Sequence, residues 1–185
     1  MLKFIVSRIY FFLPAYIANM SPPLAAKFKI FEFLNKPIDN DKKFKDLPIL
    51  GSHKTWRGVL VEIINGTLTA YLQAYLYNFS FFKNISLFNY QEKNILFFGL
   101  LISSGAILGD LFSASIKRRL NLKPGSKFIP WDQINYVIGN AFLLSFFPEF
   151  NLKLFSWLIL AFLTFFIHIV FNRIGYYLGL HNAKW

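Results

Sequence analysis

The chain has 185 residues and a formal net charge of +11, from 20 Lys and Arg against 9 Asp and Glu. Hydrophobic residues make up 55% of it, and charged residues 16%, well below the roughly 25% of soluble domains. A soluble fold of this size would have to hide too many Phe and Leu side chains. Composition therefore excludes an ordinary soluble domain and favours one membrane-embedded domain over residues 1–185. The absence of Cys excludes disulfides and thiolate metal sites.

Five apolar runs follow one another along the chain, and each predicts a membrane helix. They cover residues 2–20, 58–79, 94–115, 134–147 and 154–171, and the last extends to 180 if its flank is included. A span needs about 20 apolar residues, so the fourth run must draw in polar flanks or sit in a thinner region. Because lipid excludes unpaired backbone, these runs predict an all-α protein with about five transmembrane helices.

The first run has a second interpretation as a signal peptide. Lys3 would lie in its basic region, and residues 22–25 would lie near the cleavage site. Arg8 and Pro14 interrupt the apolar stretch, and its polar ending does not resemble a cleavage region. These features favour a membrane span.

Lys and Arg are concentrated in two loops, at 21–57 and 116–133. The positive-inside rule places these two basic loops and the C-terminus in the cytoplasm and the N-terminus outside, in the cell membrane. An odd number of spans satisfies this arrangement, in agreement with five. The cations lie between membrane spans, so nucleic acid is not an expected partner, whereas membrane lipids and anionic substrates are.

The segment 109–133 combines acids and cations at the predicted inner face of the membrane. Asp110, Ser113 and Lys117 are spaced i, i+3, i+7 and therefore share one helical face. A carboxylate and an ammonium on one stripe suit a bound Mg²⁺ and phosphate. The competing interpretation is that Asp110 is simply a solvated interfacial residue.

Asp132 and Asn135 have the same i, i+3 spacing at the start of the fourth run, and Gly139 continues that face. Their hard oxygen atoms are the ligands that Mg²⁺ prefers, and Gly139 would permit close approach of a helix or ligand. The alternative is that Asp132 only caps the helix N-terminus after Pro130.

Two groups of cations are candidates for phosphate contacts. Lys117, Arg118, Arg119 and Lys123 precede a predicted tight turn at 124–125, although their charge alone also fits a topology signal. The segment 51–58, GSHKTWRG, precedes the second run and has Lys54 and Arg57 beside Trp56; the alternative is an ordinary interfacial anchor. His53 and Glu62 have no defined role, and His168 and His181 are interpreted as packing or interface residues.

Several of these motifs together resemble the CDP-archaeol synthase family, which is related to phosphatidate cytidylyltransferase. The similarity extends over nearly the whole chain, with the motifs in the family's order. They are Asn19-Met20-Ser21-Pro22-Pro23, Pro37-Ile38-Asp39, the segment 51–58, Gly109-Asp110, Ser115-x-Lys117-Arg118-Arg119, Lys123-Pro124-Gly125 and Asp132-Gln133.

This resemblance implies an integral membrane enzyme that uses Mg²⁺ to transfer CMP from CTP to a lipid phosphate of the 2,3-di-O-geranylgeranylglyceryl type, with release of pyrophosphate. The implied catalytic residues are Asp110, Lys117 and Asp132; the implied substrate contacts are Lys54, Arg57, Ser115, Arg118, Arg119 and Lys123; and the implied metal ligands are Asp110, Asp132 and Asn135. One departure is Asn135, where the family usually has an acid. Its amide oxygen can coordinate a metal but brings no charge.

The expected reaction is in-line attack of the lipid phosphate on the α-phosphorus of CTP, with catalysis by positioning and charge stabilisation. Three alternatives stay open: a phosphatidate cytidylyltransferase acting on ester lipids, a non-catalytic protein that binds anionic lipids, and a small channel or transporter. The last is disfavoured because the second and fifth runs have few polar residues. The sequence leaves the lipid tail and the oligomeric state open.

Overall fold

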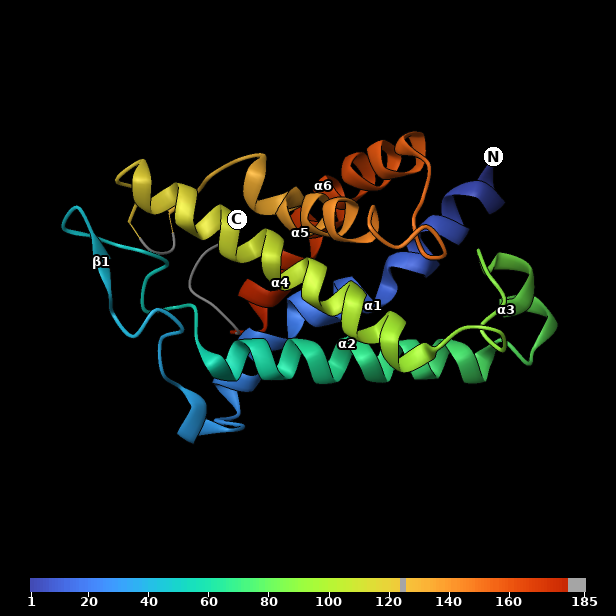
Figure 1. Cartoon of the computed structure of the whole chain (residues 1–185), viewed down its shortest axis with the longest axis horizontal. Coiled ribbons are helices and arrows are strands. Elements are labelled where there is room, and N and C mark those ends of the chain that lie inside the picture. The colour runs from blue at the N-terminus through green and yellow to red at the C-terminus, as the bar shows by residue number, and fades with distance from the viewer. Residues whose placement is uncertain (124–125, 180–185) are drawn as a thin grey trace.

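Five long helices make up most of the computed structural model, which describes residues 1–123 and 126–179 (Figure 1). They are α1 (Leu2–Lys27), α2 (Trp56–Leu76), α4 (Ile95–Arg119), α5 (Trp131–Leu144) and α6 (Leu154–Tyr177). The shorter elements are the 3-10 helix η1 (Glu32–Leu34), the antiparallel strands β1 (Lys43–Phe44) and β2 (Leu47–Pro48), and α3 (Ser80–Ile85). The predicted turn at 124–125, the extension to 180 and His181 lie outside the described residues.

The prediction of a helical membrane protein is confirmed. Within the described residues, α1, α4 and α6 are each long and apolar enough to cross a membrane. Helix α2 has 21 residues but buries Arg57 and Glu62, and α5 has only 14 residues. The total of five crossings therefore stays a prediction. The β1–β2 hairpin is a small addition that the all-α prediction did not include.

The long helices run back and forth along the long axis of the molecule, so their connections alternate between two ends. In Figure 1 the β1 hairpin marks one end, and α3 lies with the N-terminus at the other. The loop between α1 and α2 and the loop between α4 and α5 therefore meet at the β1 end. Arg119, the last residue of α4, donates to the Phe44 carbonyl at 2.9 Å and ties the two loops together.

Aromatic side chains of several helices form the centre of the bundle. Phe12 of α1 is completely buried; its ring stacks on Tyr136 of α5 and meets Trp157 of α6 edge-on. Phe11, the preceding residue of α1, packs against Phe98 of α4. These contacts join α1 to three other long helices and place it at the centre of the fold.

Helix α1 continues beyond the predicted end of its span, through Pro14, Pro22 and Pro23. The prediction that a loop begins at residue 21 was therefore wrong by about two turns. Proline lacks the N–H that would bond the carbonyl four residues earlier, and neighbouring helices can supply the missing donor. The Gln73 side-chain amide of α2 donates to the Tyr10 carbonyl, the group that Pro14 leaves without its helical donor. A polar side chain of one helix thus compensates for a proline in another.

Helices α4 and α5 cross in very close contact at glycines. A Cβ atom added to Gly139 would lie 2.2 Å from the Gly105 carbonyl oxygen and 2.5 Å from the Gly109 nitrogen. A Cβ atom on Gly109 would lie 2.1 Å from the Asn135 carbonyl oxygen. Only glycine allows such an approach of two backbones. The prediction that Gly139 permits a close helix approach is confirmed, and the crossing brings Asp110 and Asp132 to one end of the bundle.

Candidate functional site

A polar cavity of about 630 Å³ lies at the β1 end of the bundle. Its wall is built from α1, α2, α4, α5 and α6 and from residues 50–55 of the loop before α2. Seven of the ten predicted site residues line it: Lys54, Arg57, Asp110, Lys117, Arg118, Asp132 and Asn135. Residues from positions 54 to 135 are thus assembled around one space.

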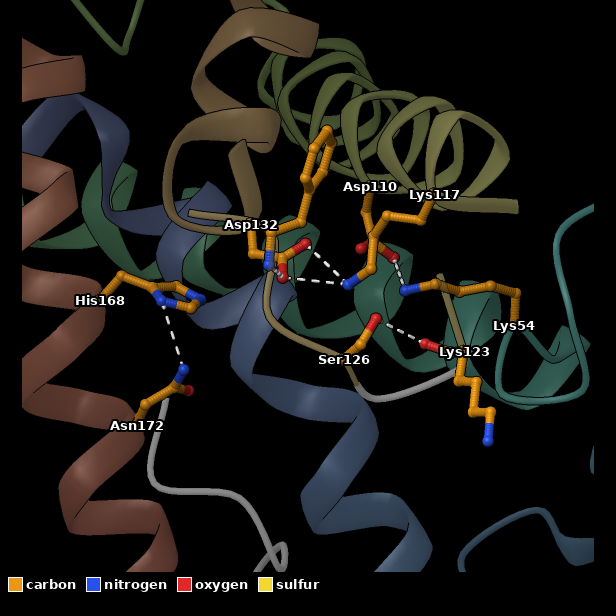
Figure 2. Close-up of polar contacts among 9 residues, drawn as sticks. Lys54, Asp110, Lys117, Lys123, Ser126, Asp132, His168 and Asn172 are labelled. Atoms are coloured by element: carbon orange, nitrogen blue, oxygen red, sulfur yellow. Dashed lines mark hydrogen bonds and ion pairs between the residues drawn. The ribbon is translucent and has the colours of Figure 1, made fainter. Parts of the chain in front are cut away.

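Two ion pairs join the cations and acids of this cavity (Figure 2). The Lys54 Nζ atom lies 2.5 Å from Asp110 Oδ2. The Lys117 Nζ atom donates to both carboxylate oxygens of Asp132, each at 3.0 Å. These charge-assisted contacts join the loop before α2 to α4, and α4 to α5. Each predicted metal-binding aspartate thus has a lysine as its partner.

Asp132 does not cap α5. The helix begins after Pro130, which has no side-chain capping bond, and Asp132 lies in the first turn. Its Oδ2 atom accepts a hydrogen bond from the Phe128 backbone N–H at 3.0 Å and so holds the preceding loop. The carboxylate near the helix N-terminus is also stabilised by the helix dipole. The simple capping interpretation is therefore wrong, because the side chain points to Lys117 and to the loop.

Lys54 lies among three acids. Burial alone would lower the pKa of Lys54, but the Asp110 carboxylate, with additional effects of Glu62 and Asp132, raises it above its ordinary value. The ammonium is therefore charged throughout the neutral range. It can neutralise an acid or hold a phosphate, but it cannot serve as a general base.

Three buried oxygen atoms on the cavity wall have no hydrogen-bond partner among the described residues. They are Glu62 Oε2, Ser113 Oγ and Asn135 Oδ1. A buried polar atom without a partner is costly, so such atoms commonly mark where a ligand or ion binds. Glu62 is only 7% exposed. The sequence alone assigns it no role, although an acid inside an apolar run is itself an indication of a functional site.

The cations of the cavity differ in their partners. Arg57 is paired with Glu32 of η1, across the loop. Arg118 is only 5% exposed, its Nε atom has no partner, and no ion pair to it occurs among the described residues. Its guanidinium thus lines the cavity without a nearby carboxylate to neutralise it. Arg118 is therefore a strong candidate to bind an anion.

The remaining three predicted site residues do not line the cavity. Ser115 is half-buried on α4, and Lys123 is exposed on the following loop, where its carbonyl accepts from Ser126 Oγ at 2.7 Å. Arg119 donates to the backbone carbonyls of Phe44 and Pro48 in the hairpin. In this structure Arg119 holds the loop above the site rather than facing the site itself.

The loop before α2 is held in place by Asp39 as well. Its carboxylate accepts from the backbone N–H groups of Leu50, Gly51 and Asp41. Burial would raise the pKa of Asp39, but these donors outweigh it and lower the pKa. Gly51 has a φ of 98°, a conformation that other residues rarely adopt. This geometry fixes the start of the 51–55 segment and therefore the position of Lys54.

An apolar groove of about 430 Å³ lies beside the polar cavity, along the crossing of α4 and α5. Phe112, Trp131 and Phe142 are exposed on its wall, which is almost entirely apolar. Ser113 and Asn135 line both the groove and the polar cavity. A ligand with a charged head and an apolar chain would fit such a pair of neighbouring sites.

Helix α6 closes the polar cavity on another side, which the sequence did not predict. His168 and Asn172 line it, and their side chains lie within 3.4 Å of each other. His168 had been interpreted as a packing residue because no motif surrounds it. One helical turn separates the two residues, but that spacing is too common to indicate a site.

The fold and the cavity together define an integral membrane protein with a site for charged ligands at one end of its helix bundle. The chain belongs to the CDP-archaeol synthase family, because the CarS-like CDP-archaeol synthase family pattern matches residues 1–185. The resemblance drawn from the motifs is therefore confirmed.

Individual relatives match over nearly their full lengths. The CDP-archaeol synthase of Pyrobaculum islandicum is 35% identical over 182 residues, which cover 96% of this chain and 98% of that protein. The corresponding protein of Archaeoglobus fulgidus is 34% identical and both chains are covered completely. A solved structure of an intramembrane enzyme for archaeal membrane lipids biosynthesis superposes with a TM-score of 0.70 at 23% identity, covering 89% of this chain and 91% of that one. That likeness supports the fold.

Proposed function

We propose that this protein is a CTP-dependent lipid-phosphate cytidylyltransferase. It transfers CMP from CTP to 2,3-di-O-geranylgeranylglyceryl phosphate or a close analogue, and the products are CDP-archaeol and pyrophosphate. Family membership supports this reaction. The structural observation that carries it is the polar, cation-lined cavity that shares Ser113 and Asn135 with an apolar groove. The groove suits the lipid chains, and the cavity suits the phosphates of both substrates.

The lipid phosphate is the nucleophile. Its oxygen attacks the α-phosphorus of CTP in line, the bond to the β-phosphate oxygen breaks, and pyrophosphate leaves. A phosphate monoester is mostly ionised near neutral pH, so the protein need not remove a proton. Its task is to hold two polyanions together, which Arg118, Lys54 and Lys117 do by charge and hydrogen bonding. Arg57 supports this wall of the cavity from its pair with Glu32.

The cavity residues also fit Mg²⁺. Asp110 and Asp132 supply carboxylates, and the unpartnered oxygens of Glu62, Ser113 and Asn135 line the same space. Within the described residues, no three His, Cys, Asp or Glu side chains form a ready metal cluster. Mg²⁺ usually binds through one or two carboxylates together with substrate phosphates, so this donor set suits it. The bound ion would neutralise charge on the triphosphate.

The site lies on the cytoplasmic side in this proposal, and the N-terminus lies outside. The two basic loops meet at the β1 end, and an excess of Lys and Arg favours the cytoplasmic face. CTP is a soluble nucleotide, so a cavity at this end would meet it directly.

The test is transfer of label from CTP by purified protein with Mg²⁺ and a panel of ether-linked and ester-linked lipid phosphates. We expect a CDP-lipid and equimolar pyrophosphate, with preference for the ether lipid. The Asp132→Asn variant should fold normally and lose at least about 100-fold in turnover, as expected for loss of a charge in a phosphoryl-transfer site. Preference for phosphatidate would assign the ester-lipid reaction, and no product with any lipid would overturn the proposal.

A further inference from the structure

The two lysine–aspartate pairs have a consequence for metal binding. Lys54 occupies one oxygen of Asp110, and Lys117 occupies both oxygens of Asp132. These carboxylates are the same groups that fit Mg²⁺ in the cavity. An ammonium and a divalent cation compete for one carboxylate and repel each other at short range. Metal and lysine therefore compete for Asp110 and for Asp132 as the pairs now stand, and each lysine lowers the affinity of its carboxylate for the metal.

We propose that Lys54 and Lys117 act as exchangeable counter-ions that prevent tight metal binding until a nucleotide arrives. When the triphosphate enters, each lysine transfers its contact from the aspartate to a phosphate oxygen. The carboxylates are then free to bind the metal. Metal and nucleotide thus bind with positive coupling, in which each raises the affinity of the other. This inference rests on the proposed function for the metal site at Asp110 and Asp132 and for the identity of the nucleotide.

The surroundings of the pairs support such an exchange. Both lysines lie on the cavity wall, so a phosphate in the cavity is within reach of their flexible side chains. Lys54 is still 28% exposed and Lys117 is 12% exposed at the side chain, so neither pair is sealed inside the protein. The exchange does not leave a buried ammonium without a counter-ion, because the phosphate replaces the carboxylate.

Arg118 provides the first contact for the incoming phosphates. It is the buried cavity cation for which no carboxylate partner is found in the described part of the chain. It can therefore bind an anion without first breaking an ion pair. The three cations consequently have different functions: Arg118 is always available, whereas Lys54 and Lys117 become available by exchange.

The test measures metal affinity without nucleotide or lipid, from the free Mn²⁺ signal in electron paramagnetic resonance titrations of purified protein. Lys54→Met and Lys117→Met should each bind Mn²⁺ at least about 10-fold more tightly than the wild type, because one carboxylate is released. Arg118→Met removes the same charge from the same cavity without freeing an acid, so its affinity should change less than about 3-fold. Lys43→Met, on the exposed hairpin, should match the wild type.

Equal gains in Lys54→Met, Lys117→Met and Arg118→Met would overturn the proposal, because general charge reduction would explain them. Unchanged Mn²⁺ affinity in both lysine variants, each with a wild-type melting temperature, would overturn it as well. The titration contains no CTP or lipid, so it is independent of the transfer assay. A failed transfer assay with the expected Mn²⁺ affinities would refute the proposed reaction and leave the competition between each lysine and the metal standing.

Discussion

Glu62 is a residue for which we expect opposite effects on stability and on function. Its carboxyl is buried in α2, lies on the cavity wall near Lys54 and has one oxygen without a partner. We expect Glu62→Gln to weaken Mn²⁺ binding about 10-fold and to lower CMP transfer, because a hard anionic oxygen is lost from the cavity. The melting temperature should stay constant or rise, since an isosteric amide replaces a buried acid whose charged form is costly.

The matched control is Glu92→Gln, an exposed acid on the loop before α4. It makes the same chemical change far from the cavity, so metal affinity and transfer should be those of the wild type. A Glu62→Gln protein that unfolds more easily while keeping its metal affinity would show that the carboxyl is structural.

Some relations between site residues could be predicted from the sequence, and others could not. Asp110, Ser113 and Lys117 could be placed on one face because helical spacing is fixed by the backbone, and all three line the cavity. The Lys54–Asp110 pair joins positions 56 residues apart, which only the packing of α2 against α4 brings together. Spacing along the chain carries no information about such a contact.

At the level of elements, Arg119 of α4 holds the β1–β2 hairpin through hydrogen bonds to its backbone carbonyls. We expect Arg119→Met to raise the KM for CTP about 5- to 10-fold with a kcat within about 2-fold, because Arg119 positions the loop that contains Lys54 and does not line the cavity. Limited proteolysis should cut residues 40–50 faster in this variant. A fall in kcat with unchanged proteolysis would instead support the direct phosphate contact predicted from the family resemblance.

The crossing of α4 and α5 depends on glycine at position 139. The Gly139→Ala methyl group would meet the backbone of Gly105 and Gly109 at 2.2–2.7 Å, so the helices must separate. We expect a loss of about 1–3 kcal/mol in stability and a larger loss of transfer, because the crossing also sets the distance between Asp110 and Asp132. Thermal unfolding in detergent and the transfer assay measure the two effects.

Gly58→Ala provides the comparison within the same protein. Its added Cβ would lie 3.7 Å from its nearest neighbours, an ordinary contact, so the helix should gain slightly in stability. Equal melting temperatures for the two variants would contradict the tight crossing.

The helices were easier to predict than their ends. Each of the five apolar runs coincides with a long helix, because a long apolar stretch in lipid must satisfy its own backbone. Helix α1 was predicted too short, since prolines normally end helices and the compensating donor from Gln73 is a tertiary contact. The hairpin was missed because its two-residue strands are held by Arg119 from another part of the chain rather than by local periodicity.

For the whole molecule, the alternation of helices determines which segments can share a face. The loop before α2 and the loop before α5 both lie at the β1 end, and the segments around α3 and before α6 lie at the opposite end (Figure 1). This arrangement agrees with the charge asymmetry from which the topology was predicted. The cavity depends on the alternation, because Lys54 comes from the first loop, Asp110 from the C-terminal half of α4 and Asp132 from the first turn of α5.

The orientation in the membrane can be tested with single cysteines, because the natural chain has none. Lys43→Cys and Glu92→Cys place a thiol at exposed positions of the two opposite ends. In intact cells, a membrane-impermeant maleimide should label position 92 and should label position 43 only after permeabilisation, because the basic end faces the cytoplasm. Labelling of position 43 in intact cells would place the cavity outside, where no CTP is supplied, and would contradict both the topology and the cytidylyltransferase reaction.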